Sequence, residues 1–96
     1  MKSFRDRESE LIANGIKSKR TLKLLPSELH YVAYKKLIYL DNIKSIESLK
    51  AWAGLKLELL KGDRKGQLSI RINDQYRICF WFKEGQAYDV EIVDYH

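Results

Sequence analysis

The sequence contains few of the residues that build covalent cross-links or metal sites. Its 96 residues include one cysteine, Cys79, and two histidines, His30 and His96. A single cysteine excludes an internal disulfide and any zinc site that needs several cysteines. It also fits the reducing cytoplasm, where we expect this chain to act.

Long hydrophobic runs are also missing. No apolar stretch approaches the roughly 18 residues that a membrane-spanning helix needs. No apolar segment follows the charged residues after Met1, so we expect neither a secretory signal nor a membrane partner. The length suits one domain, and we expect residues 1–96 to form a single one.

Positive charge is in excess and unevenly distributed. The net charge is +5, and residues 1–65 carry 15 Lys+Arg against 8 Asp+Glu. Residues 66–96 carry 3 against 5, so the excess lies in the first part. The run Lys17–Lys23 has four basic residues and no acid. Such a run is usually a solvated connector, and the alternative is contact with a phosphate or an antagonist protein.

Hydropathy patterns predict an α+β protein, with helices first and a mainly antiparallel sheet of about four strands after them. Two helices should form a hairpin on the sheet, and an N-terminal strand should join its edge. The expected segments are an edge strand over 2–7, a helical turn over 8–14, a connector over 15–25, helices over 26–40 and 45–53, and strands over 68–72, 76–82 and 88–93.

The strand register predicts an unusual pair of charges. A three-residue turn, Asn73–Gln75, puts Arg71 directly opposite Arg77 on the face away from the core. Like charges in this position are destabilising. We therefore expect an anion or a carboxylate between them, and the alternative is an ordinary surface cluster in which both arginines pair with Glu91.

The last strand ends in Asp94, Tyr95 and His96. Histidine is the side chain best suited to proton transfer near neutral pH. One alternative is a frayed polar tail, because chain ends are usually mobile. Another is a metal site formed by Glu91, Asp94 and His96, for which few ligands are available.

Three segments together resemble a known family. They are Leu60-Lys61-Gly62-Asp63-Arg64-Lys65-Gly66-Gln67-Leu68-Ser69-Ile70, then Tyr76-Arg77-Ile78-Cys79-Phe80, and finally Asp94-Tyr95-His96. The pattern is similar to the HigB toxins of bacterial toxin–antitoxin modules, also called plasmid-maintenance killer proteins, within the RelE superfamily. Lys2-Ser3-Phe4 also matches.

The resemblance implies a RelE-like fold and a small endoribonuclease that cuts messenger RNA on the ribosome and so inhibits translation. It implies a HigA-like antitoxin with a helix-turn-helix domain, through which alone operator DNA would be bound. No metal and no organic cofactor are expected in this family.

Metal-free RNA cleavage needs a base for the 2′-hydroxyl, positive charge at the phosphate and an acid for the leaving oxygen. Arg77 matches the family's sheet arginine and suits phosphate binding, and Lys61 matches a basic active-site position. His96 is the leading proton-transfer residue. Tyr95 is expected to stack on a base or bind the phosphate, and Asp94 to orient His96 or act on the 2′-hydroxyl.

Glu58 departs from the better-known members, which carry histidine at that position. A carboxylate there can act as a general base, but it also repels phosphate. Asn73 stands at the position of the family's other arginine, so Arg71 is a substitute for that charge. Arg64 and Lys65 complete the candidate RNA- and phosphate-binding set.

Three further residues are assigned structural roles. Trp81 is expected to pack under the helices or the N-terminal strand and not on RNA. Cys79 should be a small buried hydrophobe, and His30 a surface residue of its helix.

Two other functions stay open from the sequence. One is a non-catalytic RNA- or ribosome-binding protein that blocks translation by occupancy, favoured by the charge of residues 1–65 and the missing histidine at position 58. The other is a gyrase-targeting toxin of the ParE type, which shares the fold but lacks this C-terminal pattern.

Overall fold

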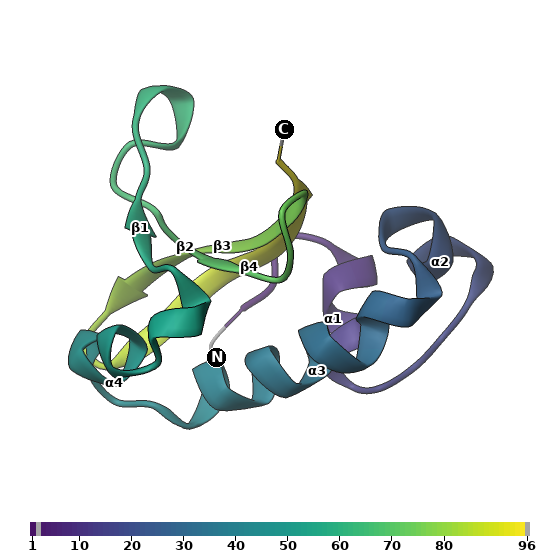
Figure 1. Cartoon of the computed structure of the whole chain (residues 1–96), viewed down its shortest axis with the longest axis horizontal. Coiled ribbons are helices and arrows are strands. Elements are labelled where there is room, and N and C mark those ends of the chain that lie inside the picture. The colour runs from purple at the N-terminus through teal and green to yellow at the C-terminus, as the bar shows by residue number, and fades with distance from the viewer. Residues whose placement is uncertain (2, 96) are drawn as a thin grey trace.

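The computed structural model describes residues 1 and 3–95 and confirms the α+β class (Figure 1). Helices occupy most of the first half and strands most of the second. In chain order the elements are α1 (Arg7–Ala13), α2 (Lys19–Leu24), α3 (Ser27–Asn42), α4 (Ile46–Ala51), the 3-10 turn η1 (Ala53–Leu55), β1 (Glu58–Leu59), the 3-10 turn η2 (Gly62–Arg64), β2 (Leu68–Arg71), β3 (Tyr76–Lys83) and β4 (Gln86–Asp94).

The four strands form an antiparallel sheet in the order β1-β2-β3-β4. Helices α1 and α3 lie along one side of it, whereas the β1–β2 connection and the C-terminal end rise on the other (Figure 1). Leu37 of α3 is fully buried with Ile70, Ile78 and Val90 of the sheet. The alternate residues of each strand therefore face away from the helices.

The N-terminal segment joins the sheet at one point. Phe4 forms an isolated parallel bridge with Val90, and Arg5 N donates to the Val90 carbonyl at 3.0 Å. The predicted edge strand is thus reduced to a single bridge, because the chain turns into α1 at Arg7. Lys2, part of that prediction, lies outside the described residues.

The basic run is not wholly a connector, because α2 occupies part of it. Ser18 starts this helix with a capping box: its hydroxyl accepts from Thr21 N at 3.2 Å, and Thr21 Oγ1 accepts from Ser18 N at 2.8 Å. The two reciprocal bonds satisfy amide groups that a helix start leaves unpaired.

The long helix α3 continues two residues beyond its predicted end. The helix includes Asp41 and Asn42, the side-chain amide of Asn42 donates to the Ile38 carbonyl at 2.7 Å, and Ile43 is the C-cap. The next helix, α4, ends at Ala51, before its predicted end, and Ser45 at its start makes no capping hydrogen bond.

Trp81 lies elsewhere than expected. It alternates with Phe80 onto the face away from the helices, next to a register shift between Cys79 and Trp81. A Cβ atom built on Gly66 would stand 2.7 Å from its ring, so the indole packs against the β1–β2 connection. It neither lies under the helices nor is fully covered, since 40% of it is exposed.

Candidate active site on the outer face of the sheet

Three of the predicted site residues, Glu58, Arg71 and Arg77, lie in strands and point to the sheet face opposite α1 and α3, which we call the outer face. Cross-strand partners share a face, and the register pairs Arg71 with Arg77 as predicted. The same alternation brings Cys79 beside Glu91 of β4. Glu58 lies opposite Ser69 at the edge of this face and is exposed.

Arg77 is held by neutral oxygen atoms. Its Nε donates to Ser69 Oγ at 2.7 Å, and its Nη2 donates to the Lys56 carbonyl at 2.6 Å and to the Ser69 carbonyl at 3.3 Å. Within the described part of the chain, Arg77 has no carboxylate partner and Nη1 has no hydrogen-bond acceptor. Its charge is therefore not compensated by an ion pair.

The opposed arginine, Arg71, is already paired. Its Nη2 contacts the carboxylate of Asp74 in the β2–β3 turn. Among the described residues Arg71 and Arg77 share no carboxylate, and the alternative that both pair with Glu91 is wrong. That an anion binds between the two arginines stays a prediction. The two side chains reach different acceptors, so their charges are separated.

Glu91 binds Arg64 instead. Its carboxylate accepts from Arg64 Nη1 at 3.0 Å, and Arg5 approaches the same oxygen at 3.8 Å. Gln67 accepts a further bond from Arg64 at 3.0 Å. Burial would lower the pKa of Arg64, but the bond to Glu91 raises it overall, and the nearby Tyr95 phenol contributes in the same direction.

Cys79 lies under these charges. The thiol is fully buried, as predicted, and burial raises its pKa. The charges of Arg64 and Arg77 lower this pKa, whereas those of Glu91 and Glu58 raise it. The two arginines and two glutamates are therefore all close enough to influence the same buried thiol, whose raised pKa favours its neutral form.

Lys36 is a third cation beside the two opposed arginines. Its Nζ donates to the carbonyl of Arg71 at 2.6 Å and to that of Ile72 at 3.4 Å. Burial lowers the pKa of Lys36, and the charges of Arg71 and Arg77 lower it further. Nothing in the sequence points to Lys36, because one lysine in an amphipathic helix carries no signal of the sheet edge that it reaches.

The C-terminal end is tied to the β2–β3 turn. Gln75 Nε2 donates to both carboxylate oxygens of Asp94, at 3.1 and 3.2 Å, and Tyr95 N donates to the Gln75 carbonyl at 2.6 Å. Tyr95 remains 40% exposed. His96 lies outside the described residues, so its role stays a prediction.

The remaining candidates lie on loops. Lys61 and Lys65 flank η2 in the β1–β2 connection, and both are exposed. The Asn73 side-chain oxygen accepts from the backbone amides of Gln75 and Tyr76, at 2.9 and 2.8 Å, and so builds the turn. Across residues 1 and 3–95, no three His, Cys, Asp or Glu side chains are placed to hold a metal ion.

Comparison with known proteins identifies the family of the chain. Residues 2–96 match the family model described as the RelE-like toxin HigB of type II toxin–antitoxin systems. The chain belongs to this HigB-like toxin family. A toxin of this type has an antitoxin as its partner, which confirms the class of module predicted from the three sequence segments.

Two relatives show how much of the chain is shared. The toxin HigB-1 of Vibrio cholerae serotype O1 is 37% identical over 65 residues, which cover 68% of each chain. The endoribonuclease HigB of Proteus vulgaris is 49% identical over 41 residues, or 43% of this chain and 45% of the relative. The second match thus spans less than half of either protein.

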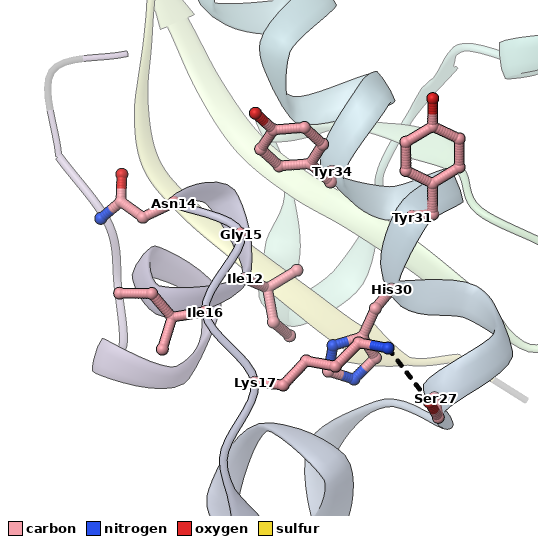
Figure 2. Close-up of a pocket in the computed structure, with 9 residues that line it drawn as sticks. All are labelled: Ile12, Asn14, Gly15, Ile16, Lys17, Ser27, His30, Tyr31 and Tyr34. Atoms are coloured by element: carbon pink, nitrogen blue, oxygen red, sulfur yellow. Dashed lines mark hydrogen bonds between the residues drawn. The ribbon is translucent and has the colours of Figure 1, made fainter.

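A separate hollow lies on the helical side of this HigB-like toxin. It has a volume of about 500 Å³, and Figure 2 shows it between the end of α1, the following loop and α3. Lys17 Nζ donates to Ser27 Oγ across it at 3.3 Å. Among the predicted site residues that the structure describes, none lines it. Its residues are Ile12, Asn14, Gly15, Ile16, Lys17, Ser27, His30, Tyr31 and Tyr34.

His30 has a structural position in this hollow. It is only 5% exposed, and its Nε2 lies 2.7 Å from the Leu25 carbonyl. The prediction of a surface residue is therefore wrong, because the ring is buried against the segment before α3, where the Leu25 carbonyl is its hydrogen-bond partner. None of the described helices is long and apolar enough to span a membrane.

Proposed function

We propose that this HigB-like toxin is an endoribonuclease that cuts messenger RNA on the ribosome, with the outer face as its active site. The observation that carries the proposal is the uncompensated guanidinium of Arg77, fixed among the other candidate residues. The name of the Proteus vulgaris relative, an endoribonuclease, supports this reaction class.

The proposed reaction uses the substrate's own 2′-hydroxyl. Its oxygen attacks the adjacent phosphorus while a base removes its proton, and the bond to the 5′-oxygen breaks as an acid protonates that oxygen. The products are a 2′,3′-cyclic phosphate and a 5′-hydroxyl. Charge accumulates on the phosphate oxygens in the transition state, where a fixed cation stabilises it most.

Each candidate residue has a role in this reaction. Arg77 binds the phosphate, with Lys61 as a second cation from the β1–β2 connection. Glu58 is the proposed base, and His96 is the leading proton donor. Tyr95, next to Arg64, stacks on a base or binds the phosphate.

Further RNA contacts are assigned to the periphery of the site. Arg64 and Lys65 approach from the β1–β2 connection, and Arg71 and Asn73 from the β2–β3 turn. Asp94 orients His96 or acts on the 2′-hydroxyl, and its bonds to Gln75 fix its place at the end of β4.

The proposed partners follow from the family. The antitoxin is HigA-like and carries the operator-binding helix-turn-helix domain, and the toxin acts in the cytoplasm, where ribosomes translate. Lys17–Lys23, the densest run of positive charge in residues 1–65, is a candidate contact for the antitoxin or for ribosomal RNA.

The test is to induce the toxin and map the 5′ ends of cellular messages. Growth arrest with new 5′ ends is expected for the wild type, and both should be lost in Arg77→Ala and after deletion of Tyr95-His96. If both variants stay fully toxic at wild-type protein levels, the site is wrong. Arrest without new ends would instead indicate inhibition by occupancy, and inhibited supercoiling would indicate a gyrase target.

A synthetic message then tests the mechanism. It is placed on ribosomes in vitro, with a 2′-deoxy nucleotide on the 5′ side of the cleaved bond. Cleavage at that position should stop, and a 2′-deoxy nucleotide two positions away should leave it intact. Continued cleavage at the substituted position would overturn attack by the 2′-hydroxyl.

A further inference from the structure

Among the described arginines of the outer face, Arg77 is oriented by hydrogen bonds and has no described carboxylate partner. Arg71 is paired with Asp74 and Arg64 with Glu91, so each has a carboxylate close to its charge. Arg77 instead donates three hydrogen bonds to uncharged oxygens. These bonds fix the plane of the guanidinium and leave its full positive charge for an anionic ligand.

Ser69 supplies two of the three acceptors. It is fully buried in β2, and its hydroxyl faces the Nε of Arg77 from the neighbouring strand. Alanine at this position would leave a charged N–H donor without its acceptor, and a half-buried arginine would then be free to change rotamer. Ser69 occurs in the sequence segment that resembles the HigB toxins, but the sequence gives it no role.

Lys56 supplies the third acceptor through its backbone. It follows η1 in a left-handed conformation, with φ 48° and ψ 56°, which side-chain-bearing residues rarely adopt. This conformation directs its carbonyl to Arg77 Nη2 at 2.6 Å. An unfavourable backbone conformation that is retained beside a candidate site is a reason to look for a functional contact.

We propose that Ser69 and Lys56 are positioning residues that hold Arg77 with Nη1 presented to the scissile phosphate. The inference rests on the proposed ribonuclease function. Neutral acceptors are essential to it, because a carboxylate in either place would hold the guanidinium equally well but would cancel the charge that the transition state needs.

A double-mutant cycle tests the role of Ser69. Ser69→Ala should lower kcat for message cleavage about tenfold, in proportion to the loss of one charge-assisted hydrogen bond, with little change in KM. In an Arg77→Lys background, which lacks the Nε donor, the same change should cost less than about twofold. Equal losses in both backgrounds would overturn the proposal, and Ser27→Ala is the matched serine control.

Lys56 is tested by two substitutions that remove the same side chain. Lys56→Gly retains easy access to the left-handed conformation, whereas Lys56→Val strongly disfavours it. Cleavage by Lys56→Val should therefore fall about tenfold below that of Lys56→Gly. Equal activities would show that the left-handed conformation and the carbonyl that it directs are not needed.

A spectroscopic measurement separates this inference from the proposed activity. In ¹H–¹⁵N spectra, the Nε–H of Arg77, assigned by its loss in Arg77→Lys, should exchange slowly with solvent in the wild type. Exchange should become at least about tenfold faster in Ser69→Ala and stay slow in Ser69→Thr, which keeps the hydroxyl. Unchanged exchange in Ser69→Ala would overturn the positioning role even if the protein cleaves RNA. Slow exchange in a protein that does not cleave would leave the contact established and overturn its catalytic purpose.

Discussion

Arg71 and Arg77 face each other directly across β2 and β3, yet their side chains have different partners. The Arg71 side chain binds Asp74 in the β2–β3 turn, whereas the Arg77 side chain reaches from β3 to Ser69 of β2 and to the Lys56 carbonyl. Because the two guanidinium groups reach different partners, the repulsion expected of opposed like charges is reduced. The consequence is a division of roles, with one arginine neutralised and the other available.

This division predicts unequal effects of two alanine substitutions. Arg77→Ala should lower the rate of message cleavage by about 100-fold or more, as removal of a fixed transition-state donor does. Arg71→Ala should lower the cleavage rate only about fivefold, because Asp74 already compensates the charge of Arg71. Cleavage rates on ribosomes, measured at equal concentrations of folded protein, check the difference, and equal losses would contradict it.

Glu58 is expected to act as the general base. Glu58→Gln keeps the shape but cannot accept a proton, so cleavage should fall by about 10- to 100-fold. In Glu58→His, an imidazole that titrates near pH 6.5 should restore activity, and the rate should rise as the pH passes through that value. A fully active Glu58→Gln protein would place the base elsewhere, with Asp94 as the next candidate.

The β1–β2 connection should tolerate alanine at one glycine and not at another. Both Gly62 and Gly66 have positive φ, of 66° and 96°, so each substitution costs about 1–2 kcal/mol in backbone strain. At Gly66 the new Cβ would also stand 2.7 Å from the Trp81 ring, whereas nothing lies within 4 Å at Gly62. In urea unfolding, Gly66→Ala should therefore lower the free energy of unfolding by about 1–3 kcal/mol more than Gly62→Ala does. The double variant with Trp81→Leu should recover part of that difference, and equal losses at the two glycines would contradict the contact.

A buried serine on the helical side should be important for stability and not for chemistry. Ser9 is fully buried, and its hydroxyl accepts from the backbone amide of Ile92 at 2.9 Å. Ser9→Ala should lower the free energy of unfolding by about 1–3 kcal/mol, because that amide loses its partner away from water. Ser3→Ala is the control at a more accessible serine, which also accepts from a β4 amide, that of Asp89. A loss at Ser9 no larger than that at Ser3 would contradict the argument.

Cys79 should make stability depend on pH in the alkaline range. Burial raises the pKa of the thiol in the folded protein above its unfolded value, so the unfolded chain loses this proton first as pH rises. Below the pKa of the thiol in the unfolded chain, roughly 8.5, the protonated thiol contributes fully to the free energy of unfolding. This contribution declines as the pH rises from there toward the pKa of the thiol in the folded protein. Urea titrations from pH 7 to 10 should show a steeper decline for the wild type than for Cys79→Ala. Parallel curves would show that the thiol is not protected by burial.

The sheet was predictable because its information is local. Alternating apolar residues and a three-residue turn between β2 and β3 determine which side chains share a face, and Arg71 opposite Arg77 follows from parity alone. The N-terminal region was less predictable. Whether the residues around Phe4 form a strand depends on how soon α1 begins, and the hydropathy pattern leaves that open.

The sequence named candidate site residues, and it did not indicate their contacts. Resemblance to the HigB toxins pointed to Arg77, Glu58 and the C-terminal residues, and the family match confirms the kind of protein. The alternative that paired Glu91 with Arg71 and Arg77, however, was wrong. The side chain that it binds, Arg64, is 27 residues away on a loop whose path no periodic pattern describes.

The sequence by itself thus determined the strand register, the family and the set of charged residues that a phosphate could meet, because periodicity and motif spacing are properties of neighbouring residues. Only the tertiary structure decided which acceptor holds each guanidinium. The Arg77 contact with Lys56 joins positions 21 residues apart and depends on a left-handed backbone turn after η1. Such a contact is the result of packing many segments at once, and it makes Arg77 a fixed, uncompensated cation.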